Sequence, residues 1–328
     1  MKYQSNIWLR RLSKLTVFST LFLIFVGALV KSHEVGLSVP DWPTTYGKPM
    51  FSFPLTEMVG GIFYEHGHRM LATIIGFFTL VQAISIGFSN SPFWLKRLGF
   101  VALGTVILQG MFGGITVLFY LPPAVSMIHG VLAQTFFIIT IIIAYSLSNE
   151  RYKREEMGYN EDIKKGSLFL ISFVYIQLIL GALMRHTASG MAIPDFPTMG
   201  GLWIPTFSES MLNNINVDLF DMDWDMVSRN QVIIHFIHRF GALIVSTFIG
   251  YFFFKNNSVF KTNNILNKTK WLIILVLIIQ VFLGALTVLT ERAPYVASFH
   301  VVNGAALLGL SILLVLRAHP IEFSKWIK

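Results

Sequence analysis

Eight long apolar runs constrain what this 328-residue chain can fold into. A helix that crosses the hydrocarbon core of a bilayer, about 30 Å thick, needs roughly 20 apolar residues. The runs lie near residues 14–31, 62–87, 95–120, 123–147, 167–186, 230–254, 270–290 and 294–317. Hydrophobic residues make up 54% of the chain and charged residues only 13%, a composition that excludes a soluble domain. The predicted fold class is therefore an all-α integral membrane protein with eight transmembrane helices.

The basic residues predict the orientation of these helices. Lys and Arg number 25 against 17 acidic residues, and 18 of the 25 lie in the two tails and the loops between alternate runs. This pattern explains the positive charge through membrane topology and gives no indication of nucleic-acid binding. It predicts that both termini are cytoplasmic and that the long loops 32–61 and 187–229 lie on the outer side. We interpret the acidic run of the second loop as solvated surface: Asp218, Asp221, Asp223 and Asp225.

An internal repeat divides the chain into two halves. The series Gly27, Ala28, Leu29, Lys31, Gly36, Pro40, Asp41 and Pro43 recurs at a constant offset as Gly181, Ala182, Leu183, Arg185, Gly190, Pro194, Asp195 and Pro197. Farther along, His68, Arg69, Gln109, Gly113, Thr116 and His129 recur as His238, Arg239, Gln280, Gly284, Thr287 and His300. We expect two tandem four-helix bundles, residues 1–150 and 151–328, related by a pseudo-twofold axis along the membrane normal.

Four histidines occupy matching places in this repeat. His68, His129, His238 and His300 lie in the second, fourth, sixth and eighth runs, each about six residues, or about 9 Å, from the outer end. Equal depth lets them face each other in pairs within each half and hold an iron porphyrin between two helices. A single histidine in a bundle is more often a hydrogen-bonded packing residue, but duplication favours ligands. Cysteine is lacking throughout, which excludes disulfides, thiolate ligands and covalent c-type haem.

Ionisable groups crowd the start of the second run. Charged side chains inside a bilayer cost about 3 kcal/mol or more, so they usually mark a functional site. Glu65 and His68 are three residues apart and share a helix face, so we expect them to act together. The position that matches Glu65 in the second half is His235, which predicts proton chemistry in the first half and electron storage or transfer in the second. Arg69 and Arg239 are candidates for contacts with haem propionates, and the alternative is a cation that anchors the helix at the membrane surface.

These features together resemble the haem A synthase family, membrane enzymes that oxidise the C8 ring methyl of haem O to a formyl group. The residues that carry the resemblance are Glu65, His68 and Arg69, the counterparts His238 and Arg239, the histidines His129 and His300, and the loop motifs Pro40-Asp41-Trp42-Pro43 and Pro194-Asp195-Phe196-Pro197. The resemblance implies that Glu65 is catalytic and that His68 and His129 hold the substrate haem O. It further implies that His238 and His300 hold a haem b cofactor through its iron.

The resemblance also implies a setting: the bacterial plasma (inner) membrane, with the haem sites toward the outer side. Its implied partners are haem O synthase and the factors that assemble terminal oxidases, with membrane lipid around the chain and homo-oligomers left open. Many relatives carry a cysteine pair in the first outer loop, where this chain has Ser38 and Thr45. A disulfide relay is therefore excluded here, and the proline-rich motifs are expected to form rigid lids or interfacial turns.

Two other classes of protein use similar residues. A di-haem b-type cytochrome that takes electrons from quinol would use the same four histidines but would not need Glu65 beside one of them. A haem transporter would be expected to place its ligands nearer the midplane of the bilayer.

Overall fold

Eight long helices dominate the computed structural model, which describes residues 6–154 and 161–318. Within these ranges, eight helices of 24 to 28 residues are long and apolar enough to cross a membrane. They are α1 (Ile7–Ser32), α2 (Gly61–Phe88), α3 (Phe93–Leu118), α4 (Pro123–Ser146), α6 (Glu161–His186), α8 (Arg229–Lys255), α10 (Asn264–Leu289) and α11 (Pro294–Ala318). The eight predicted spans and the all-α membrane fold are confirmed. The first helix begins earlier than predicted because the Asn6 side chain accepts a hydrogen bond from the backbone N–H of Trp8.

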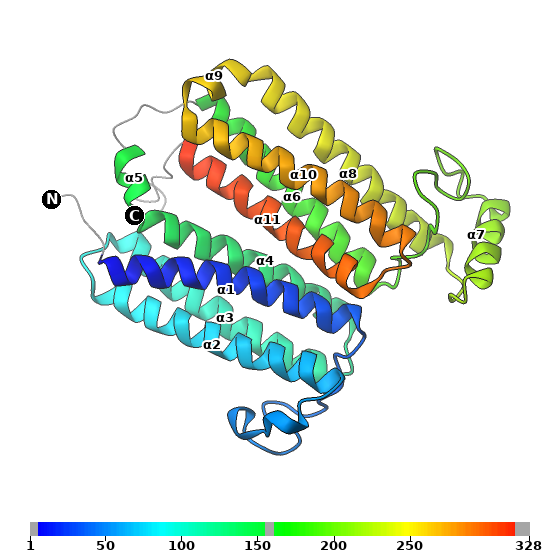
Figure 1. Ribbon diagram of the computed structural model, residues 1–328, viewed down its shortest axis with the longest axis horizontal. Coiled ribbons are helices and arrows are strands. Elements are labelled where there is room, and N and C mark those ends of the chain that lie inside the picture. Colours follow the sequence, from blue (N-terminus) through cyan, green and yellow to red (C-terminus); the bar gives the residue numbers. More distant parts are fainter. Residues whose placement is uncertain (1–5, 155–160, 319–328) are drawn as a thin grey trace.

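The helices form two groups of four (Figure 1). In the first group each helix packs against its neighbours in the ring order α1, α2, α3, α4, so that α2 and α4 lie diagonally opposite. In the second group the ring order is α6, α8, α10, α11, which places α8 and α11 on a diagonal. The matching order of packing fits the predicted tandem bundles, and the pseudo-twofold relation itself stays a prediction.

The two groups meet mainly along α11, which packs against α1, α4 and α6 as well as α10. Phe137 and Ile141 of α4 are buried there against Ala305 and Ile312 of α11. Because other helices cover α11 on most sides, 56% of its most apolar 18-residue segment is buried. This share is larger than in any other candidate span of the described chain.

The ends of the helices define two faces of the molecule. The start of α1 and the end of α11 lie at one end of the bundle, together with α5 (Asn149–Arg154) and α9 (Asn257–Thr262). The two long loops lie at the opposite end (Figure 1). The first contains two short 3-10 helices, η1 (Met50–Ser52) and η2 (Leu55–Glu57), and the second contains α7 (Glu209–Asp221).

Helix α7 was not predicted from the sequence, which indicated a loop over these residues. Its N-cap is Ser208, whose hydroxyl accepts a hydrogen bond from the Met211 N–H, and Met211, Ile215 and Leu219 at four-residue spacing are buried. The acidic run, Asp218, Asp221, Asp223 and Asp225, is exposed at the end of α7 and just after it, which confirms its interpretation as solvated surface.

Candidate functional site: two histidine pairs and two loop clamps

His68 and His129 each lie against a glycine of the preceding membrane helix. A Cβ added to Gly27 of α1 would lie 2.9 Å from Cε1 of His68, and one added to Gly113 of α3 would lie 3.3 Å from Cε1 of His129. The first distance is too short and the second is tight for a methyl group, so the glycines let the imidazole rings approach the neighbouring backbone. Both glycines belong to the repeat found in the sequence.

The second half repeats this packing. A Cβ added to Gly181 of α6 or to Gly284 of α10 would lie 3.1 Å from Cε1 of His238 or of His300. All four histidines lie among the helices and are partly buried, so part of each side chain stays accessible. Each pair comes from the two diagonal helices of its bundle, so the rings point into the same interior.

The separation of the second pair suits a shared metal ion. The ring centres of His238 and His300 are 6.5 Å apart, with their planes at 77°. A metal held between two imidazoles by metal–nitrogen bonds of about 2 Å separates the ring centres by about 6 Å. The first pair comes from the matching helices α2 and α4, and each of its rings packs on the matching glycine of the repeat.

Several of these rings also carry a nitrogen that the protein does not satisfy. The buried Nδ1 atoms of His68, His129 and His300 make no hydrogen bond within the described chain. Unsatisfied buried nitrogens are uncommon and call for a ligand. The glycine contacts and the unsatisfied nitrogens of both pairs fit an iron porphyrin between the histidines, and the ring spacing of the second pair fits it as well. Among the described residues, no group of three or more His, Cys, Asp and Glu side chains gathers as a small-metal site would require.

Glutamine amides orient three of the four histidines. Gln177 donates from Nε2 to the His238 carbonyl (2.8 Å) and lies 3.1 Å from its Nδ1. The Nε2 of Gln109 lies 3.3 Å from Nε2 of His129, and that of Gln280 lies 3.4 Å from Nε2 of His300.

The exception is His68. The residue that matches Gln177 in the first half is Leu23, which has no amide to offer. Both histidines of the second pair are therefore held by a glutamine, whereas in the first pair only His129 is held. The sequence reading missed Gln177, because its partner in the repeat is apolar.

The direct hydrogen-bond partners of the Glu65 carboxylate are Arg69 and Val39, and its joint action with His68 stays a prediction. Its Oε1 accepts a hydrogen bond from Arg69 Nη2 at 2.5 Å, and its Oε2 accepts one from the backbone N–H of Val39 at 2.8 Å. The i,i+4 spacing of Glu65 and Arg69 favours this ion pair, and both side chains are buried. Glu65 thus connects α2 to the long loop between α1 and α2.

Arg69 completes this connection. It donates to the carbonyl oxygens of Val39 (2.7 Å), Asp41 (2.7 Å) and Thr44 (3.2 Å). We call Glu65, Arg69 and the loop segment 39–46 the first loop clamp. The predicted contact of Arg69 with a propionate would have to compete with these bonds.

The second half contains a matching clamp, made by His235, Arg239 and the loop segment 193–200. Nδ1 of His235 lies 3.2 Å from the Ile193 nitrogen and Nε2 lies 3.1 Å from Arg239 Nε, and a neutral imidazole accepts a hydrogen bond at one of these two nitrogens. Arg239 also donates to the carbonyls of Ile193 (3.0 Å), Asp195 (2.8 Å) and Thr198 (3.0 Å). The two clamps use the same positions of the repeat, with an imidazole in place of the carboxylate.

An aspartate shapes each clamped loop. Asp41 accepts from the backbone N–H groups of Tyr46 (2.7 Å) and Gly47 (2.9 Å) and from the Thr44 hydroxyl (2.5 Å). Slight burial alone would raise the pKa of Asp41, but these donors lower it to about 2. Asp195 accepts from the N–H groups of Gly200 (2.7 Å) and Gly201 (3.0 Å), and its pKa is also lowered by its donors despite its burial.

Trp42 of the first loop rests on α3. A Cβ added to Gly114 would lie 2.6 to 2.8 Å from three atoms of the Trp42 indole, so the indole and the helix backbone are in direct contact. Gly114 directly follows the glycine that faces His129. In the second half the matching residues are Phe196 and Ala285, and the Phe196 ring lies 5.7 Å from the guanidinium carbon of Arg239.

His66, for which the sequence gave no role, also fixes the first loop. Its Nδ1 lies 2.9 Å from the hydroxyl of Thr45, and its ring packs 5.1 Å from that of Phe53. Thr45 of the first loop thus takes part in a hydrogen bond to α2.

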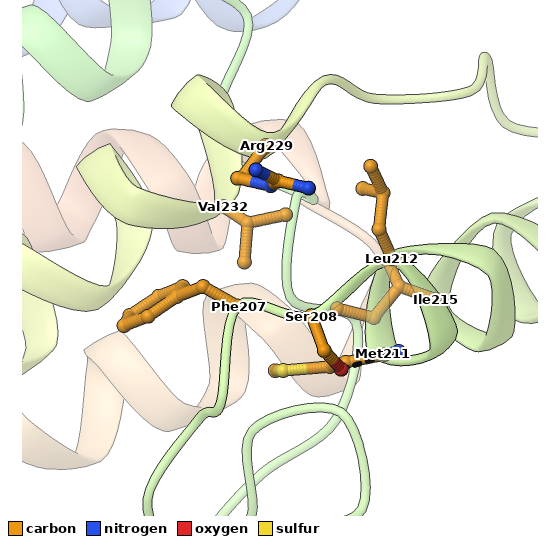
Figure 2. Close-up of a pocket in the computed structure, with 7 residues that line it drawn as sticks. All are labelled: Phe207, Ser208, Met211, Leu212, Ile215, Arg229 and Val232. Atoms are coloured by element: carbon orange, nitrogen blue, oxygen red, sulfur yellow. Dashed lines mark hydrogen bonds between the residues drawn. The ribbon is translucent and has the colours of Figure 1, made fainter.

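A small hollow between α7 and α8 is a separate feature. Its lining is Phe207, Ser208, Met211, Leu212, Ile215, Arg229 and Val232 (Figure 2). The lining is mostly apolar and includes none of the predicted site residues. We interpret it as the packing surface of α7.

The fold and the two sites define a multi-pass helical membrane protein of two similar halves, each with a buried histidine pair beneath a clamped loop. The family model described as cytochrome oxidase assembly protein (COX15-CtaA) matches residues 10–312, and the chain belongs to this family.

Relatives of known name agree with this assignment. The heme A synthase of Pelagibacter ubique is 25% identical over 326 residues, covering 87% of this chain and 89% of the relative. The heme A synthase of Shouchella clausii is 24% identical over 291 residues, covering 87% and 88%. The heme A synthase of Staphylococcus saprophyticus is 24% identical over 324 residues, covering 94% and 97%.

Proposed function

We propose that this chain is a haem A synthase, which oxidises the C8 methyl of haem O to a formyl group and supplies haem A to terminal oxidases. The proposal rests on the family, on relatives named for this activity and on the two histidine pairs. In it, His68 and His129 hold the substrate haem O, and His238 and His300 hold haem b. Haem b supplies one-electron redox chemistry when it is bound.

The glutamines are the observation that best supports this division of labour. A permanent cofactor benefits from ligands that are fixed in place, and both histidines of the second pair are held by glutamine amides. A substrate must enter and leave, and in the first pair His68 lacks such a partner while His129 has one.

We assign Glu65 as the catalytic carboxylate of the first site. It is the acidic residue one helical turn from His68, and its carboxylate is oriented by the Val39 N–H and by Arg69. A carboxylate there can take up a proton lost by the methyl group or stabilise positive charge on the methyl carbon. Trp42 of the same loop rests against Gly114 of α3.

The proposed setting follows from the helix topology. The helix ends and short connections at the end of the bundle where α1 begins and α11 ends carry most of the Lys and Arg residues, so we place that end in the cytoplasm and the clamped loops outside a bacterial plasma membrane. The proposed neighbours are the haem O synthase that supplies the substrate and the terminal oxidase that receives the product.

The experiment is expression in a host that makes haem O but no haem A, followed by separation of the extracted haems by chromatography and mass. We expect haem A from the wild-type chain and none from the double variant that combines His68→Ala with His129→Ala. A chain that holds only haem b, with a reversible low-spin spectrum and no formyl product, would establish the electron-transfer cytochrome instead.

A further inference from the structure

Three basic side chains gather between the two halves, at the loop end of the bundle. Arg185, at the end of α6, donates from Nη2 to the Ala28 carbonyl and to the Ser32 hydroxyl oxygen of α1, both at 2.7 Å. Lys31 lies in the same last turn of α1 as Ser32, and Arg292, in the turn before α11, reaches Glu34 just after that turn. We call Lys31, Arg185 and Arg292 the basic seam.

The charges of the basic seam are only partly balanced. Glu34 is the carboxylate beside it: its Oε1 lies 3.6 Å from Arg292 Nη2, and its side chain is 70% exposed. Arg185 donates to neutral oxygens, although its side chain is partly buried. Enclosed cations that repel one another are costly unless an anion joins them.

The favourable interaction of cations with helix C-termini accounts for part of this arrangement. Lys31 and Arg185 both lie in the last turn of their helices, where the helix dipole stabilises positive charge. The helix dipole does not account for Arg292, because this residue lies in the turn between α10 and α11 and not in the last turn of a helix. The clustering therefore needs a further explanation.

The repeat connects the seam to the histidine pairs. Lys31 is four residues after Gly27, which touches His68, and Arg185 is four residues after Gly181, which touches His238. Residues four apart share a helix face and are separated by about 6 Å along the axis. Each half thus places one cation about one helical turn outside its histidine pair, while Arg69 and Arg239 are engaged with their loops.

We propose that the basic seam binds the carboxylate groups of the two porphyrins, with Lys31 serving the first site and Arg185 the second. This inference rests on the proposed function, because it takes haem as the ligand of both pairs. Arg185 also reaches α1 through Ala28 and Ser32, so it joins the outer edges of the two sites. Guanidinium and ammonium groups are well suited to carboxylates in such a place.

The test uses the full-length, haem-loaded protein in detergent and measures the rate at which haem passes to an excess of apomyoglobin. We expect Lys31→Gln and Arg185→Gln to lose haem about tenfold faster than the wild type, equivalent to about 1.4 kcal/mol. We also expect Arg185→Gln to shift the haem b midpoint potential to a lower value, because removing a nearby cation favours the ferric state. Arg229→Gln is the matched control, since it removes an exposed cation at the same end of the molecule.

The outcomes separate this inference from the proposed function. A wild-type chain that purifies without haem overturns both. A haem-loaded wild type whose seam variants keep the same haem loss and potential overturns this inference alone. If the seam variants keep haem normally but retain less phosphatidylglycerol than the wild type, the seam binds lipid phosphate and the inference is wrong.

Discussion

The two loop clamps use the same positions of one repeat with different chemistry. In the first, the buried Glu65 carboxylate joins Arg69 to the Val39 N–H, and in the second the buried His235 imidazole joins Arg239 to the Ile193 N–H. The backbone acceptors of the two arginines also match one for one. Since a histidine suffices to hold the second loop, holding the loop does not explain why the first half has a carboxylate.

The largest expected difference between the halves concerns haem itself. We expect His300→Ala to lose the low-spin haem b spectrum and all haem A formation, because it removes a ligand of the cofactor. We expect His129→Ala to keep that spectrum and lose only the product. Visible spectra and haem extraction measure both, and equal loss of haem b in the two variants would contradict the division of labour.

Replacing the arginine of a clamp should destabilise the protein more in the first clamp than in the second. Arg69→Gln leaves a buried carboxylate without its cation, which we expect to cost about 3–5 kcal/mol. Arg239→Gln leaves a neutral imidazole, and we expect a smaller loss of about 1–3 kcal/mol. Thermal unfolding in detergent compares the two variants, with exposed Arg229→Gln as the control. Equal destabilisation would show that the ionic character of the first clamp contributes little.

A methyl group added at Gly114 should destabilise the first half, although the second half has an alanine, Ala285, at the matching position. Gly114→Ala forces the Trp42 indole away from α3, at a cost of about 1–3 kcal/mol, because the added carbon would overlap it. Trp42→Phe in the same chain should restore stability, since Phe and Ala occupy the matching positions of the second half. Unfolding temperature and haem A yield report the effect. A Gly114→Ala variant that behaves as the wild type would show that the indole contact is dispensable.

The smallest expected effect is a pH dependence of the first loop. The pKa of Asp41 is lowered to about 2 in the folded loop, so its stabilising contribution is present above about pH 4 and is lost as the pH falls toward 2. Limited proteolysis of the loop with pepsin across this range should show a transition in the wild type. Asp41→Asn should lack that transition, and an identical pH profile in both proteins would contradict the assignment.

Much of the fold could be predicted from the sequence, because apolar length and the repeat are local or periodic signals. All eight spans were predicted, although the first helix starts earlier, and α7 was missed because its three buried residues lie within an acidic, polar stretch. The histidines were found through their duplication. Their glycine neighbours belonged to the repeat, but the contacts became visible only in three dimensions.

The partner of Glu65 could not be settled from spacing alone. His68 at i+3 and Arg69 at i+4 are both within reach on a helix, and the choice depends on a loop 26 residues earlier, whose Val39 N–H fixes the carboxylate. Likewise, the carbonyl groups that engage Arg69 and Arg239 are presented by the folded loops, and no side-chain pattern announces them.

The most direct test of the account is Glu65→His, which copies the clamp of the second half into the first. The variant should hold its loop, retain haem and unfold near the wild-type temperature, because His235 already shows that an imidazole can hold such a loop. We predict that its haem A yield falls about 100-fold or more, as expected when a catalytic carboxylate is removed. A Glu65→His chain that makes haem A at the wild-type rate would show that Glu65 is only a structural clamp.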